Sequence, residues 1–240
     1  MILEDITFLN KVVELYNLIY VNELVFLIDV NNTILFAGEK IQEVINCHPK
    51  TLIGKNHLDI LPLPQENISS VNASIDKVIK TKSPQEFLSI NLNHNHEYLI
   101  LDCVLKPIIN PVTDNIVAIG VESRKLDAKL YLYKLLLLLE NNQINLNQHT
   151  PHIDPLLTLR EHEIAFLLFY CKSTKKIATI LGDLYGKSVT SKTISNIISS
   201  GLYPKLQVYG IDALINKLHS LGYHTKIPVS FLINMHLDLE

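Results

Sequence analysis

The polar stretch NNQINLNQHTPHIDP at 141–155 divides this 240-residue chain into two parts with different hydrophobic patterns. Over most of the first part, apolar residues form short β-rich runs. After the stretch they recur every three to four residues, as on one face of a helix. Such a change of period across an Asn-, Gln- and Pro-rich segment is typical of a domain boundary. We therefore expect an α+β chain in which a mixed sheet-and-helix domain precedes an all-α domain.

The first part predicts one five-stranded antiparallel sheet with helices on one face. Asn31 and Asn32 form a polar turn between two β-rich runs, which indicates a hairpin. Two strands, several short helices and three further strands then follow one another, an order that fits a single sheet. Strands are predicted at 24–30, 33–38, 86–93, 97–108 and 115–123, and helices at 39–46 and 66–82.

This order of elements resembles a PAS sensory domain over about Leu18–Arg124. The resemblance is carried by the turn at Asp29, by LIGKNHLDILP at 52–62 and by the closing strand NIVAIGVES at 115–123. It implies an interior pocket between sheet and helices, filled either by an unidentified small molecule or by side chains. No cofactor is predicted, and the sequence does not identify the residues that would bind a ligand.

A leucine-rich segment, LDAKLYLYKLLLLLENNQINLN at 126–147, predicts a long helix that is apolar on more than one side. Two interpretations carry equal weight: the helix packs on its own domain, or it pairs with a second copy and couples the two domains. The predicted plan is a PAS-like sensor domain with an N-terminal helix (1–124), a connecting and dimerisation helix with linker (125–150), and a helix-turn-helix domain with a C-terminal extension (151–240).

The last part predicts four helices, with two helix starts marked by capping residues. Thr158 and Glu161 form a capping box, and Ser173 precedes the second helix. The third helix begins after Thr190 and carries an isoleucine side, and the fourth spans YGIDALINKLHSLGY at 209–223.

These motifs resemble the LuxR-type helix-turn-helix. That family has a Leu-Thr-x-Arg-Glu opening, an Ile-Ala-x-x-Leu scaffold helix and a recognition helix that begins Ser/Thr-x-x-Thr-Val. The residues that match or nearly match are Leu157, Thr158, Arg160, Glu161, Glu163, Ile177, Ala178, Leu181, Thr190, Thr193, Ile194, Lys205 and Leu206.

Several features depart from the family. GDLYGKSV at 182–189 adds about six residues to the expected tight turn. Gly201 weakens the end of the recognition helix, and Pro204 is expected to end it. That helix contains no arginine, and the apolar tail at 226–240 has no counterpart in the family.

In such a motif the recognition helix enters the major groove and presents side chains near its start to base edges. Lys192 and Asn196 face away from the isoleucines, so Lys192 fits a guanine edge or a phosphate and Asn196 fits adenine. The expected DNA contacts are Lys192, Asn196, Ser195, Ser199, Ser191 and Thr190 on or beside the helix, with Lys187, Lys176, Lys175 and Lys205 near phosphates.

The charge distribution agrees in sign with binding to a polyanion. From Pro151 onward nine basic residues face seven acidic ones, a balance of +2, against −5 for the remainder. Homodimerisation through the leucine-rich helix would let two recognition helices read a two-fold related site on double-stranded DNA.

No pattern for catalysis, metal binding or membrane insertion is present. The ten histidines are scattered: His94 and His96 alternate in one loop, and His48 and His57 lack a haem-ligand spacing. Glycine-rich phosphate loops and nucleophile elbows are absent, no apolar run reaches the length of a membrane span, and the three cysteines are unpaired in spacing. We expect a cytoplasmic protein that is not an enzyme.

The sequence thus predicts a transcription regulator in which a PAS-like sensor controls a LuxR-type DNA-binding domain. The alternative is a protein–protein interaction module whose degenerate helix-turn-helix no longer binds DNA and which docks a partner through its apolar tail. The modest charge, the long turn and the missing arginine favour the alternative. The signal, the operator and the direction of regulation are not encoded in any recognisable motif.

Overall fold

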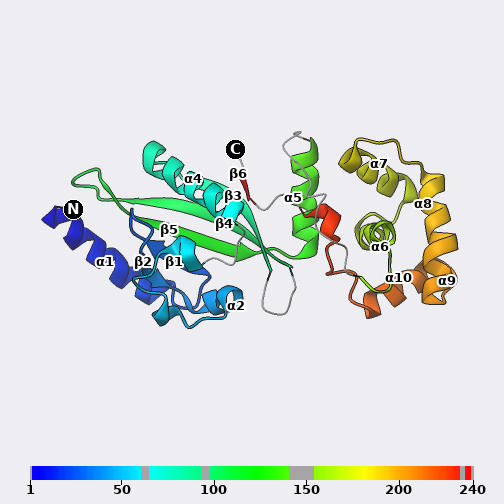
Figure 1. The fold of residues 1–240 in the computed structure, drawn as a ribbon, viewed down its shortest axis with the longest axis horizontal. Helices are drawn as coiled ribbons and strands as arrows, with labels where there is room; N and C mark the ends of the chain where they lie inside the picture. Colours follow the sequence, from blue (N-terminus) through cyan, green and yellow to red (C-terminus); the bar gives the residue numbers. More distant parts are fainter. Residues whose placement is uncertain (1, 61–64, 93–97, 141–153, 233–235, 239–240) are drawn as a thin grey trace. The chain divides into compact units, whose positions relative to one another are not determined.

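The computed structural model describes residues 2–60, 65–92, 98–140, 154–232 and 236–238. They fall into two compact units (Figure 1). The sheet unit contains the chain up to Leu126 together with the C-terminal strand, and the helical unit runs from Asp127 to Asn234. No helix among the described residues is both long and apolar enough to cross a bilayer.

The sheet unit contains an antiparallel sheet in the order β2-β1-β5-β4-β3-β6. All five predicted strands are confirmed, and β6 is a sixth strand that the sequence did not indicate. The strands are β1 (Val25–Ile28), β2 (Ile34–Ala37), β3 (Gln85–Leu92), β4 (Tyr98–Ile109), β5 (Ile116–Lys125) and β6 (His236–Asp238). The helices are α1 (Leu3–Ile19), α2 (Gln42–Ile45), α3 (His57–Ile60) and α4 (Gln65–Thr81), with 3-10 turns η1 (Glu39–Ile41) and η2 (Pro49–Thr51).

The predicted β1–β2 hairpin is closed by the side chain of Asp29. Its Oδ1 accepts hydrogen bonds from the backbone N–H groups of Asn31 and Thr33, both at 2.8 Å. Asn32 adopts a left-handed conformation with φ of 65°, which Asn tolerates better than most residues. The Asp-x-Asn sequence therefore fixes where the two strands reverse.

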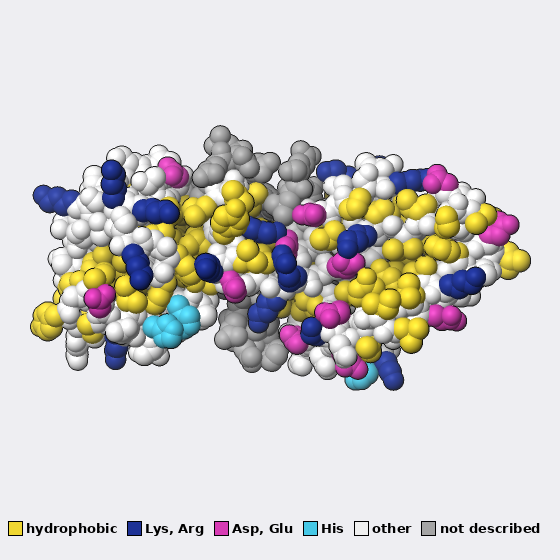
Figure 2. Space-filling view, turned by 180° about the vertical axis from the view of Figure 1, so that it is seen from behind, with side chains coloured by type: hydrophobic (Ala, Val, Ile, Leu, Met, Phe, Trp, Pro, Cys, Tyr) yellow, Lys and Arg dark blue, Asp and Glu magenta, His cyan; other side chains and the backbone are white. Residues whose placement is uncertain are grey.

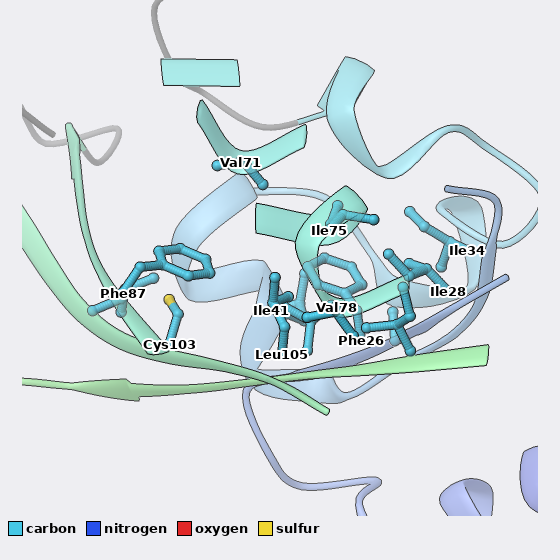
Figure 3. Close-up of a cluster of buried hydrophobic side chains, with 14 of the residues drawn as sticks. Phe26, Ile28, Ile34, Ile41, Val71, Ile75, Val78, Phe87, Cys103 and Leu105 are labelled. Atoms are coloured by element: carbon cyan, nitrogen blue, oxygen red, sulfur yellow. The ribbon is translucent and has the colours of Figure 1, made fainter. Parts of the chain in front are cut away.

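Both faces of the sheet are covered, because neighbouring residues of β1 point to opposite sides. Phe26 and Ile28 pack with Val71, Ile75 and Val78 of α4 in the main core (Figure 3). On the other face, the odd-numbered residues of β1 pack against α1. The prediction of helices on one face was therefore incomplete, since α1 buries the second face.

Close approach and hydrogen bonds together fix α1 on the sheet. A Cβ atom on Gly120 of β5 would lie 2.5 Å from the hydroxyl of Tyr16, so this position requires glycine. Asp5 is buried and accepts hydrogen bonds from Thr113 (2.6 Å), Asn115 (2.9 Å) and Asn110 (2.8 Å) in the β4–β5 turn. These bonds, that from Thr113 first, hold the pKa of Asp5 below its usual value.

The helical unit contains the four predicted helices and the described part of the leucine-rich helix. Its elements are α5 (Ala128–Glu140), α6 (Leu159–Cys171), α7 (Thr174–Tyr185), α8 (Ser191–Ile197), the π-helical segment η3 (Ile198–Leu202), α9 (Tyr203–Leu206), α10 (Ile211–Ser220) and the 3-10 turn η4 (Val229–Phe231). The predicted end of the leucine-rich helix and most of the predicted linker lie at 141–153, outside the described residues. The three-part domain division stays a prediction.

Candidate nucleic-acid interface and sensor cavity

The start of α6 anchors the helices that carry the DNA-binding candidates. Thr158 and Glu161 form the predicted capping box, in which Glu161 Oε2 accepts a hydrogen bond from the Thr158 N–H at 2.8 Å. The same oxygen accepts a bond from Lys205 Nζ at 2.5 Å. Burial acts to raise the pKa of Glu161, but the bonds from Lys205 and Thr158 outweigh it and hold this pKa below its usual value. Glu161 thus joins α6 to α9.

The residues expected to lengthen the turn instead lengthen α7. Helix α7 begins at its Ser173 cap and continues to Tyr185, where Gly186 ends it with φ of 59°. Tyr185 fixes this last turn because its ring lies 4.7 Å from the Arg160 guanidinium and its hydroxyl donates to Glu163 Oε1. The connection to α8 is therefore short, and the expectation of an extended turn is wrong.

Helix α8 buries one side and exposes the other, as predicted. The Thr190 hydroxyl accepts a bond from the Thr193 N–H at 3.2 Å and caps the helix. Ile194 and Ile198 are buried, whereas Lys192 and Asn196 are exposed. Among the described residues, the side chains of Lys192 and Asn196 have no hydrogen-bond or ion-pair partner, so both are available to a ligand.

The recognition helix is longer than expected, because Pro204 does not end it. The chain continues from α8 through the π-helical η3 into α9 and stops at Gln207, which has φ of 54°. In η3 the Tyr203 N–H bonds to the Ile198 carbonyl, one residue further back than in an α-helix, which lets the chain take up Pro204 without a break. A Cβ atom on Gly201 would lie 2.7 Å from Glu161 Oε1, so glycine is required for close packing on α6.

All ten predicted DNA contacts are exposed, but they are not equivalent. The hydroxyls of Ser195 and Ser199 bond to backbone carbonyls one helical turn back. Lys205 is held by Glu161, whereas Lys175, Lys176 and Lys187, the other predicted phosphate contacts, form no ion pair with any residue that the structure describes. On the face in Figure 2, Lys and Arg side chains are spread over the helical unit and not gathered in one cluster. The roles of these residues in DNA binding stay predictions.

The apolar tail is part of the helical core, which the sequence did not reveal. Phe231 is fully buried and packs on Phe166 with ring centroids 5.9 Å apart, and its carbonyl accepts a bond from the Tyr131 hydroxyl of α5 at 2.7 Å. Ser230 donates to the buried carboxylate of Glu163 at 2.6 Å. The η4 segment and α5 are therefore integrated with α6, and these tail side chains are not displayed as a docking surface.

Helix α5 buries one side in the helical unit and leaves an apolar strip outside. Tyr131 and Leu135 are fully buried. Leu130, Tyr133 and Leu137, spaced for one face, are 36%, 60% and 41% exposed. Both interpretations of this helix thus have a physical basis: it packs within its own unit and retains an apolar face.

The sheet unit encloses the predicted cavity between β-strands and the helices beyond β2. Its volume is about 40 Å³. That space suits a few waters or one small ligand. The lining is Leu24, Phe26, Ile41, Val44, Ile45, His57, Val71, Phe87, Ser89, Leu101, Cys103, Val121 and Ser123. In Figure 3, Phe87 and Cys103 lie beside each other at one end of the core.

His57 is the most buried polar residue of this lining, at 2% exposure. Burial lowers its pKa to about 4, so the imidazole is neutral at physiological pH. In the sequence, His57 and His48 were considered only as haem ligands, and their spacing did not support that role. His48 is exposed and accepts a bond from the Lys50 N–H, while His94 and His96 lie outside the described residues. No group of three or more metal-binding side chains occurs among the residues described.

No protein-family model matches the sequence, and no curated protein matches it. Among solved structures, VqmA of Vibrio cholerae in complex with a ligand and DNA is similar over 95% of this chain and 95% of that chain, with 19% identity and a TM-score of 0.57. A phage VqmA in complex with DPO is similar over 99% of this chain and 98% of that chain, with 16% identity and a TM-score of 0.55.

The fold resembles that of VqmA. The likeness extends over nearly the whole of both chains, so it covers the sheet unit and the helical unit together. It confirms the predicted fold class, a mixed sheet-and-helix domain followed by an all-α domain. With fewer than one residue in five shared with VqmA, the part played by each side chain follows from this chain's own contacts.

Proposed function

We propose that this chain is a DNA-binding transcription regulator in which a small molecule in the sheet unit controls a LuxR-type helix-turn-helix. The observation that carries the proposal is the division of α8. Ile194 of α8 and Ile198 at the start of η3 are buried, while Lys192 and Asn196 are exposed and their side chains have no partner among the described residues. The solved complexes of VqmA with ligand and DNA support the same assignment.

The regulator acts as a homodimer, with the exposed strip of α5 as the contact between copies. Leu130, Tyr133 and Leu137 would bury their apolar surface against a second copy of the helix. Two recognition helices held at a fixed spacing could then occupy successive major grooves of a two-fold related site. Ligand binding would shift the population between dimer geometries that fit DNA and those that do not. Access to genomic DNA places such a regulator in the cytoplasm.

The interaction-module alternative is not carried forward. It required the apolar tail as a docking surface, but Phe231 and Leu232 are 0% and 3% exposed. It also drew on the long turn, which is an extension of α7.

Fluorescence anisotropy with a library of genomic fragments tests the proposal. We expect Lys192→Ala and Asn196→Ala each to weaken specific binding by about 5- to 100-fold, since a good base contact contributes about 1–3 kcal/mol. As a control, Lys80→Ala removes the same charge from an exposed position on α4, in the sheet unit, and should leave DNA binding unchanged. Affinity should also fall steeply with salt. Equal affinities for all three variants and wild type would refute α8 as the DNA-reading element.

A further inference from the structure

The cavity of the sheet unit contains a polar atom that the fold leaves without a partner. His57 lines this cavity at 2% exposure, and its Nδ1 atom makes no hydrogen bond within the part of the chain that the structure describes. Buried polar atoms are nearly always hydrogen-bonded, so each exception needs an explanation. A missing ligand is one such explanation when the atom's side chain borders a cavity.

Two other histidines also have a buried Nδ1 atom, but their surroundings differ. His162 is held through its other ring nitrogen, 3.0 Å from the Lys226 carbonyl oxygen, and His224 stacks on His219 at 4.1 Å between ring centroids. Neither belongs to the lining of the sheet-unit cavity. Among these three histidines, only His57 combines an unpaired nitrogen with a bordering cavity.

The position of the His57 ring is fixed from two sides. Its backbone N–H donates to the Asn32 carbonyl at 2.7 Å, which ties the start of α3 to the β1–β2 hairpin. The ring packs edge-on against Phe26, with centroids 5.0 Å apart and an angle of 72° between planes. The imidazole is therefore held at the cavity wall before any ligand arrives, which lowers the entropic cost of binding.

The other lining residues restrict what kind of molecule can bind. The part of the lining that the structure describes contains no Asp, Glu, Lys or Arg, and its remaining polar side chains are two serines and one cysteine. A charged ligand would lose its hydration without gaining a counter-ion, which is unfavourable. The lowered pKa of His57 keeps the imidazole neutral, so it offers one donor and one acceptor nitrogen.

We propose that His57 is the polar anchor of the cavity and exchanges one hydrogen bond with a small, uncharged, largely apolar ligand that carries a single hydrogen-bonding group. The inference rests on the proposed function only in placing the ligand in this cavity. The inference adds two points to that function: the chemical class of the ligand, and the residue, His57, that would favour this ligand over an apolar molecule of the same shape.

Three probes of similar size, phenol, toluene and benzoate, separate the contributions of the hydrogen-bonding group, the apolar ring and a negative charge to binding. Calorimetric titration of the full chain without DNA should show binding of phenol and toluene and none of benzoate. In His57→Phe the phenol-to-toluene affinity ratio should fall by about tenfold, the effect of one hydrogen bond. His57→Gln, which keeps a neutral donor and acceptor, should restore part of the ratio.

A measurement on the wild-type protein tests the inference even if the His57→Phe variant does not fold. Phenol should shift the ¹⁵N resonance of one buried imidazole nitrogen, and toluene should not. An unchanged affinity ratio in folded His57→Phe, benzoate binding as tight as phenol, or failure of all probes to bind would each overturn the inference. Because the titrations contain no DNA, such a failure would leave the assignment of α8 intact, and loss of DNA binding would leave this result intact.

Discussion

Two deeply buried polar side chains, one in each unit of this protein, have different surroundings. In the helical unit, Glu163 is 1% exposed on its side chain, and its carboxylate contacts Arg160 at 2.9 Å, Ser230 at 2.6 Å and the Tyr185 hydroxyl. In the sheet unit, His57 is as deeply buried but keeps an unpaired nitrogen beside a cavity. The first side chain stabilises a fixed scaffold through these contacts, whereas the second borders the cavity in which we propose that a ligand binds.

The largest effect that would test this comparison is expected at Glu163. Glu163→Ala removes the acceptor of Ser230 and Tyr185 and leaves the Arg160 charge without its partner. Arg160 is 40% exposed on its side chain, so the main loss comes from the two hydroxyls left without an acceptor, at about 1–3 kcal/mol each. The free energy of unfolding of the helical unit should fall by the sum of these losses in urea titration. Glu163→Gln keeps the acceptor oxygen and should lose less. Equal losses would show that charge alone matters here.

The next effect is a pH dependence that originates at His57. Its pKa is about 4 in the folded protein and about 6.5 in a model peptide, so between these values the unfolded chain binds the proton more readily. Stability should be unaffected above pH 6.5, decrease as pH falls, and level off below pH 4, with a total loss of about 3 kcal/mol.

Thermal unfolding of wild type and His57→Phe between pH 7 and 5 checks this expectation. The variant should have a flatter profile in that window, where carboxylates remain ionised. Parallel profiles would mean that His57 is protonated without cost and that the sheet unit does not keep it neutral.

A smaller effect on stability is expected at Gly201, where the packing against α6 leaves no room for a side chain. Its added Cβ would lie 2.7 Å from Glu161 Oε1, and Glu161 cannot easily move because Lys205 and Thr158 hold it. Gly201→Ala should lower stability by about 1–3 kcal/mol, as overpacked cores do. Gly186→Ala is a useful contrast, since its strain comes from φ of 59° and nothing lies within 4 Å. In a double-mutant cycle, Glu161→Gln should couple to Gly201→Ala and not to Gly186→Ala.

Local patterns made much of the fold predictable. The β1–β2 turn, the Thr158–Glu161 capping box and the Thr190 cap depend on residues within a few positions, and the structure shows each of them. The exposed side of α8 also followed from helical spacing alone. These features predicted both domain types and the surface now proposed to read DNA.

Long-range contacts set the limit of what the sequence could predict. The passage of the helix beyond Pro204 depends on the packing of η3 against Glu161, which is 40 residues away from Gly201 in the chain. The burial of His57 depends on which residues surround a cavity, and the tail's place in the core depends on partners such as Tyr131 and Phe166. No short sequence pattern predicts such contacts between residues that lie far apart in the chain.

The pairing of β6 with β3 has a practical consequence for dividing this chain into fragments. Residues 87–89 of β3 are matched by 236–238, so the sheet is assembled from both ends of the polypeptide. A fragment that stops at Leu126 would leave the backbone N–H and C=O groups on that side of β3 unmatched, which invites self-association. Recombinant pieces of the sheet unit should therefore carry the final residues grafted back, and bulky fusion partners belong at the N-terminus.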